Sequence, residues 1–157
     1  TKIKNSHSFF FIDPFALEFK WDSMEKVLKC KCDILFTFMT NSINRARNSA
    51  FTSPHNKTEG LDHFFGGISW KDKSRDVMDI YCEKIIAARP NALIETVRVG
   101  YYDLMFITKQ TSGNNQWMRA LKTAKKEIES NSKKAVKITL DKFNRGQKDL
   151  SSYYATN

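Results

Sequence analysis

Ser8–Phe15, which reads SFFFIDPF, is the most strongly patterned stretch of the chain. Its apolar run from Phe9 to Ile12 is typical of a strand that is buried on both faces inside a parallel sheet. Pro14 has no N–H and restricts the residue before it, so the strand must end at Asp13. We therefore expect a central strand whose carboxyl end carries the Asp13 carboxylate, at the edge where open α/β sheets form their ligand crevices.

A helix and a second apolar strand follow this stretch. The helix is predicted from about Trp21 to Lys31, with Asp22 or Ser23 as its N-cap. The segment 33–40, DILFTFMT, is the second predicted strand. A strand, a helix and a strand in this order form a βαβ unit, in which the two strands run parallel with a right-handed crossover.

A small polar cluster ends the second predicted strand. Asn41 or Ser42 can cap the helix that begins there, and Arg45 lies on that helix. Because parallel strands end on the same side of a sheet, these polar groups should emerge at the same edge as Asp13. An arginine there can pair with a phosphate or a carboxylate. The alternative for Asn41 and Arg45 is a helix cap and a solvated basic side chain.

The middle of the chain predicts a loop, a helix and a hairpin. Residues 48–60 are rich in Ser, Thr, Asn, Pro and Gly and predict a mobile loop, and Gly66-Gly67 predicts a tight turn. A helix is expected over about 73–89, followed by strands at 92–100 and 101–110 that pair as an antiparallel hairpin. The predicted fold class is α/β. We expect an incomplete, Rossmann-like three-layer sandwich in which a terminal antiparallel hairpin joins the parallel strands. The open sheet edge beside the first strand is a liability unless another chain covers it.

Positive charge is concentrated near the end of the chain. We predict that residues 1–157 form a single, partial domain and that segment 114–150 is a basic helix. The formal net charge is +9, and in residues 114–157 Lys and Arg outnumber Asp and Glu by six. Such a segment can bind nucleic acid, or it can be the solvated face of a lysine-rich helix. The candidate nucleic-acid contacts are Arg119, Lys122, Lys125, Lys126, Lys133 and Lys134.

Other classes of protein are disfavoured by the sequence. No apolar run is long enough to span a membrane and no signal peptide is present, so we expect a cytoplasmic protein. The three cysteines are an odd number and predict reduced structural thiols. The three histidines lack the spacing of metal ligands, so no metal site is expected. Neither a GxGxxG fingerprint nor a P-loop occurs.

Four pieces of the sequence resemble the three-Cys-motif partner proteins (TcmP), a bacterial and archaeal group similar to class I S-adenosylmethionine-dependent methyltransferases. The resemblance extends from Phe9 to about Ile128. It implies a strand with an acid-Pro-aromatic motif, then a helix, a strand, a helix and an antiparallel strand pair. The four pieces are FFFIDPF followed by Trp21, DILFTFMTNSINR (33–45), LDHFFGGISW (61–70) and YYDLMFITKQTSG (101–113).

The resemblance also implies a set of site residues. Asp13, Pro14 and Phe15 would form the catalytic motif, in which Asp13 accepts a hydrogen bond from an exocyclic amine and Phe15 stacks on an extruded base. Trp21, together with Asn41 and Arg45, would bind the substrate. Methyltransferases that act on base amines carry two prolines after the acid or Asn, whereas this chain has one.

The cofactor implied by the resemblance is S-adenosylmethionine, but the N-terminal half that binds it lies outside this sequence. We therefore expect this chain alone to be inactive. Its open sheet edge would be covered by the missing half or by another copy of the chain. Whether the protein is an enzyme stays open, and the alternative is a non-catalytic nucleic-acid-binding or assembly module on a Rossmann-like scaffold.

Overall fold

The computed structural model describes residues 7–53, 58–109, 119–131 and 134. By contacts the chain divides into two compact units, residues 1–113 and 114–157. The elements of the first unit are β1 (Ser8–Ile12), α1 (Trp21–Leu28), β2 (Cys32–Phe38), α2 (Thr40–Thr52), α3 (Glu59–Phe65), the short 3-10 helix η1 (Ser69–Lys71), α4 (Val77–Ala88), β3 (Ala92–Val99) and β4 (Tyr102–Lys109).

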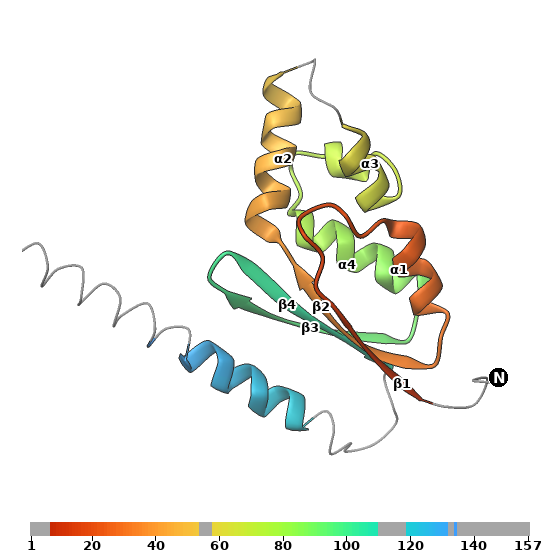
Figure 1. The fold of residues 1–157 in the computed structure, drawn as a ribbon, viewed down its shortest axis with the longest axis vertical. Coiled ribbons are helices and arrows are strands. Elements are labelled where there is room, and N and C mark those ends of the chain that lie inside the picture. The colour runs from red at the N-terminus through yellow and green to blue at the C-terminus, as the bar shows by residue number, and fades with distance from the viewer. Residues whose placement is uncertain (1–6, 54–57, 110–118, 132–133, 135–157) are drawn as a thin grey trace, which may run out of the picture. The chain divides into compact units, whose positions relative to one another are not determined.

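The four strands form one mixed sheet in the order β1-β2-β4-β3 (Figure 1). β1 and β2 pair in parallel, with α1 as the connection between them. β4 pairs antiparallel with both β2 and β3, so β3 runs in the same direction as β1 and β2. The predicted α/β class, the parallel pair and the hairpin are confirmed. The sequence did not indicate that the returning strand β4, rather than β3, would lie beside β2.

The main core lies between the sheet and helices on one of its faces. Ile34, Phe36 and Phe38 of β2 point into this core at alternate positions and are almost fully buried. Figure 1 shows α1, α3 and α4 on one side of the sheet. The third layer expected from the sequence is not formed by residues 7–53 and 58–109, because the helices in these ranges cover one face only.

β1 is an edge strand, so the prediction of a central strand buried on both faces is wrong for the described chain. Phe10 and Ile12 pack against the core, whereas Phe9 is 56% exposed and Phe11 is 61% exposed. A strand with a continuous apolar run is buried on both faces only where other elements cover both faces of the sheet. The described residues provide that layer on one side.

Two predicted N-caps are also wrong. α1 begins at Trp21 with Lys20 as its N-cap, so Asp22 and Ser23 lie in its first turn. α2 begins at Thr40, and its N-cap Met39 makes no side-chain hydrogen bond. Each helix therefore starts one or more residues before the polar side chain that was expected to cap it.

α2 also extends into the segment that was predicted to be a loop. The helix continues through Thr52, and the predicted loop includes residues 54–57, which lie outside the described part of the chain. Its polar residues are compatible with a helix because one face of α2, centred on Ile43, is buried against the core.

Gly66 ends α3 in a left-handed conformation, with a φ of 59°. Gly67 donates its N–H to the carbonyl of Asp62 at 2.8 Å, which closes the C-terminal turn. A Cβ atom at Gly66 would lie only 2.4 Å from Cδ1 of Trp21. The predicted tight turn is therefore a helix terminus packed directly on α1.

The predicted helix at 73–89 is shorter than expected. α4 begins at Val77, and the Asp76 carboxylate caps it by accepting the N–H of Met78 at 2.7 Å. Residues 72–75 instead form a turn in which the Asp72 carboxylate accepts hydrogen bonds from Ser74. These hydrogen bonds hold the pKa of Asp72 below its usual value.

Arg47 of α2 is a buried cation that binds backbone carbonyls. Its Nε donates to the carbonyl of Trp70 at 2.7 Å, and one terminal nitrogen donates to the carbonyl of Arg75 at 2.9 Å. The other terminal nitrogen donates to the carbonyl of Asp72. Only 7% of Arg47 is exposed, so this side chain fixes the irregular segment between α3 and α4 from the inside.

Tyr81 lies at the centre of the aromatic core. Its ring stacks on Phe64, with ring centres 4.9 Å apart, and on Phe36, with centres 5.7 Å apart. The hydroxyl is buried and has no hydrogen-bond partner among the described residues. Burial also raises the pKa of the phenol above its usual value, so the group stays neutral.

The substitution Tyr81→Phe should preserve the fold and increase its stability. The change removes a buried hydroxyl that no described protein group satisfies and keeps both stacked rings. We expect the free energy of unfolding to rise by about 1 kcal/mol. Urea denaturation monitored by circular dichroism measures it. A loss of about 1 kcal/mol or more would mean that this hydroxyl makes a stabilising hydrogen bond.

The three cysteines are free thiols in the structure. Cys32 is buried in the core, and desolvation raises its pKa. Among the described helices, none is both long and apolar enough to cross a membrane.

In the second unit, residues 119–131 and residue 134 are helical. Arg119, Lys122, Lys126 and Lys134 are exposed, and Lys125 is partly buried. Lys133 lies outside the described residues, as does the rest of the predicted helix from 135 to 150.

Candidate functional site

Two strands of the sheet bring some of the predicted site residues to one edge. β1 and β2 are parallel, so Asp13 after β1 and Asn41 after β2 lie at the same, carboxyl edge. Asp13 is exposed, and Phe15 is 75% exposed. Within the described part of the chain, Asp13 has no hydrogen-bond or ion-pair partner. The acid and the aromatic ring are thus both presented to solvent beside the end of β1.

The turn after Phe15 contains an unusual backbone conformation. Ala16 has a φ of 51°, in the left-handed region that residues other than glycine rarely adopt. Glu18 donates its N–H to the carbonyl of Phe15 at 3.2 Å, which closes the turn. A left-handed alanine costs about 1 kcal/mol. Strained residues of this kind cluster at functional sites, and this one adjoins Phe15.

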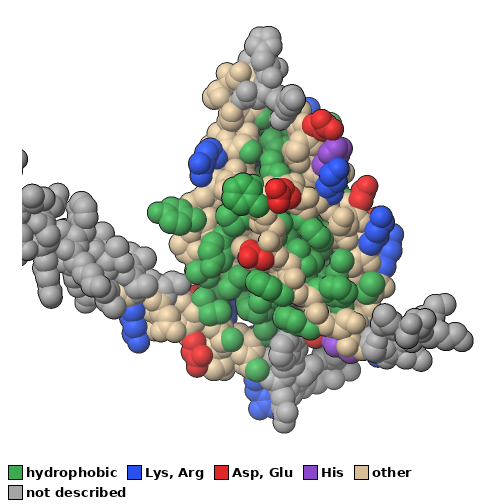
Figure 2. All heavy atoms as spheres, viewed as in Figure 1, with side chains coloured by type: hydrophobic (Ala, Val, Ile, Leu, Met, Phe, Trp, Pro, Cys, Tyr) green, Lys and Arg blue, Asp and Glu red, His purple; other side chains and the backbone are tan. Residues whose placement is uncertain are grey.

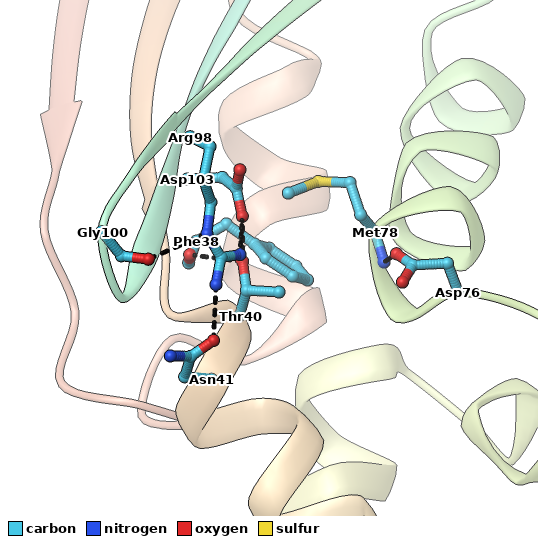
Figure 3. Close-up of polar contacts among 8 residues, drawn as sticks. All are labelled: Phe38, Thr40, Asn41, Asp76, Met78, Arg98, Gly100 and Asp103. Carbon is cyan, nitrogen blue, oxygen red and sulfur yellow. Dashed lines mark hydrogen bonds and ion pairs between the residues drawn. The ribbon is translucent and has the colours of Figure 1, made fainter. Parts of the chain in front are cut away.

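Asn41 takes part in a polar network with the β3–β4 hairpin (Figure 3). Arg98 of β3 donates to the Asn41 side-chain oxygen at 2.5 Å, to the Asp103 carboxylate at 2.7 Å and to the Gly100 carbonyl at 3.0 Å. The Thr40 hydroxyl donates to the same Asp103 carboxylate. The network therefore ties the start of α2 to the hairpin and holds the Asn41 side chain in one orientation.

Sequence reasoning missed Arg98 and Asp103 as members of this edge. The two residues are directly opposite each other in the hairpin register, so their pairing follows from a turn centred on Gly100-Tyr101. That register was available from the sequence. The step that was missing is the placement of β4 beside β2, which brings the pair next to Asn41.

Trp21 and Arg45 lie in different environments. Trp21 is only 8% exposed and packs edge-on against Tyr81, with ring centres 5.6 Å apart. The ammonium group of Lys84 lies 4.6 Å from its ring centre. Trp21 is therefore a core residue in this structure. Arg45 is exposed on α2, and no contact joins it to the Arg98 network among the described residues.

A separate hollow of about 370 Å³ lies along α4. It is lined by residues that include Arg75, Asp79, Cys82 and Glu83. Burial raises the pKa of the Cys82 thiol to about 11, so this group is a neutral thiol near pH 7 and a poor nucleophile. In the described ranges, no group of three His, Cys, Asp or Glu residues is placed to hold a metal ion.

Comparisons of the chain with models of protein families, with curated proteins and with solved structures found no match. The geometry of the carboxyl edge and the charge of the second unit therefore carry the functional interpretation.

Proposed function

We propose that this chain supplies the C-terminal half of a methyltransferase-like domain of the TcmP type, acting on nucleic acid or another macromolecular partner. One observation carries the proposal. A parallel strand pair joined by a helix is followed by further helices and then by an antiparallel hairpin. The four strands belong to one sheet. This order of elements agrees with the one that the sequence resemblance implies for the end of a class I methyltransferase sheet.

Asp13 and Phe15 have the exposure that such a role needs. A carboxylate without a partner among the described residues can accept a hydrogen bond from the exocyclic amine of a base. An exposed aromatic ring beside it can stack on the same base. Arg98 holds the side-chain oxygen of Asn41, which leaves the NH2 of the same amide as a donor towards a substrate.

S-adenosylmethionine would supply the methyl group, and the residues that bind it would come from outside this sequence. β1 is the edge of the described sheet, and the described residues of the first unit provide helices on one face only. A half-domain that added strands beside β1 and helices over the other face would complete a three-layer sandwich. Under this proposal the cofactor lies next to Asp13.

Binding of S-adenosylmethionine tests the proposal. The tagged chain is purified under mild conditions from cells that produce it naturally, together with any segment or protein that accompanies it, and is titrated calorimetrically. We expect the assembly to bind the cofactor and residues 1–157 alone not to bind it. An assembly that shows no binding contradicts the methyltransferase proposal.

A second candidate function is nucleic-acid binding through the second unit. Arg119, Lys122 and Lys126 are exposed at positions i, i+3 and i+7 of a helix, so they lie on one face of it. Leu121 and Ile128 are spaced to lie on another face. A basic stripe of this kind binds phosphates without needing a catalytic site.

The salt dependence of binding to a short single-stranded DNA measures this contribution. The slope of log K against log salt is negative. Each of Lys122→Ala and Lys126→Ala should reduce the magnitude of this slope by about 0.7 to 1. Lys29→Ala is the matched control, because Lys29 is an exposed lysine at the end of α1 that pairs with Glu25. Unchanged slopes for both test variants would argue against this face as a nucleic-acid contact.

A further inference from the structure

The outer side of β1 has a backbone pattern that is suited to pairing with another strand. Ser8 donates its N–H to the carbonyl of Lys31 at 3.1 Å, so the even-numbered residues of β1 direct their backbone groups towards β2. The backbone N–H and C=O groups of Phe9 and Phe11 therefore point away from β2, outwards in the plane of the sheet. Among the described strands, none pairs with this side.

The surface around this edge is apolar. Phe9 and Phe11 are more than half exposed, and their side chains lie on the face of the sheet opposite α1. β1 is the strand nearest the viewer in Figure 1, and in the same view Figure 2 shows hydrophobic side chains gathered across the middle of the molecule. An exposed edge strand flanked by apolar side chains is a surface for association.

The sequence of the edge is complementary to itself in one register. If two copies of β1 pair antiparallel around Phe10, Phe9 of each copy lies opposite Phe11 of the other. The outward backbone groups of these two residues then face each other and can exchange both hydrogen bonds. In the same register His7 lies opposite Asp13, which pairs an imidazole donor with a carboxylate. Nε2 of His7 already contacts the Asp33 carboxylate at 2.7 Å. In the imidazolium form of His7 both ring nitrogens are donors, so Nδ1 can donate to Asp13 at the same time.

We propose that the chain by itself forms a two-fold symmetric dimer through β1, with Phe9 opposite Phe11 and His7 opposite Asp13. The pairing gives one continuous eight-stranded sheet from the two four-stranded sheets. The four phenylalanines cover one another on the face opposite α1. This inference does not rest on the methyltransferase proposal. A cofactor-binding half would compete for the same edge, so the dimer is the form of the chain that lacks it.

Charge substitutions at the two exposed phenylalanines test both the interface and its register. The double variant F9K/F11K places lysine opposite lysine. It should weaken self-association by at least about 100-fold relative to the unmodified chain. The variant F9K/F11E places lysine opposite glutamate in the proposed register and should remain a dimer. In a register shifted by two residues in either direction, F9K/F11E would instead place like charges opposite each other.

The measurement is sedimentation equilibrium over a range of concentrations, with circular dichroism to confirm that each variant is folded. Ile68→Lys is the matched control, because Ile68 is 66% exposed and lies outside β1. We expect dimers for the unmodified chain, I68K and F9K/F11E, and a monomer for F9K/F11K. An unmodified chain that is monomeric throughout overturns the proposal. So does F9K/F11K that associates normally, or folded F9K/F11E that is as monomeric as F9K/F11K.

Discussion

Arg47→Ala should destabilise the first unit by about 3–5 kcal/mol, the cost typical of breaking a buried, hydrogen-bonded charge network. Arg47 is 7% exposed and donates to the carbonyls of Trp70, Asp72 and Arg75. Removing the guanidinium leaves three carbonyl groups of the segment before α4 without this donor. The truncation also leaves a cavity beside Phe51, over which the guanidinium carbon lies 5.9 Å from the ring centre.

Arg45→Ala is the matched control for this prediction. It removes the same side chain two positions earlier on α2, where the arginine is exposed. We expect a change within about 0.5 kcal/mol. The loss of stability in Arg47→Lys should lie between those of R45A and R47A, since an ammonium group cannot reproduce the planar set of N–H donors of a guanidinium group. Urea denaturation of the three variants measures the order of their free energies of unfolding. Equal midpoints for R45A and R47A would contradict the role given to Arg47.

Gly66→Ala should be the second most damaging single change, at about 2–4 kcal/mol. Two costs add at this position. The backbone has a φ of 59°, which costs an alanine about 1 kcal/mol. The new Cβ would also lie 2.4–2.8 Å from three atoms of Trp21, which α1 and Tyr81 hold in place. Relieving this overlap by shifting α1 away from α3 costs roughly a further 1–3 kcal/mol.

Gly100→Ala separates the two costs. Gly100 also has a left-handed φ, at 62°. Apart from its two chain neighbours, however, no described residue has an atom within 4 Å of the point that a Cβ would occupy there. We expect G100A to lose about 1 kcal/mol, from the backbone alone. Thermal unfolding of both variants gives the difference. If G66A and G100A lose the same stability, the contact between Gly66 and Trp21 does not constrain the fold.

The strand and helix types of the first unit were predictable because the apolar pattern alone specifies them. β2 alternates core and outer residues. Pro14 marks the end of β1, and Gly100 marks the turn between β3 and β4. The position of β1 at the edge was not predictable, because SFFFI has the same pattern whether one or two layers cover it. Helix starts were misplaced where backbone geometry replaced a side-chain cap, as at Lys20 and Met39.

The candidate site was predictable in part, for a different reason. Asp13 and Asn41 follow the two strands of a parallel pair, and strand direction alone places them at one edge. Arg98 and Asp103 join Asn41 only because β4 lies between β2 and β3, which depends on long-range pairing rather than on local sequence. Arg47 was overlooked beside Arg45 because burial, rather than residue type, distinguishes the two.

Methyl transfer by an Asp13 variant tests the central claim most directly. The assembly purified with the chain is incubated with S-adenosylmethionine that carries a labelled methyl group and with nucleic acid, and incorporation is counted. We expect transfer by the unmodified protein and a loss of at least about 100-fold in Asp13→Ala. Asp22→Ala, an exposed aspartate on the first turn of α1, should keep full transfer. Equal transfer by D13A and the unmodified protein, or none by the unmodified assembly, would contradict the account.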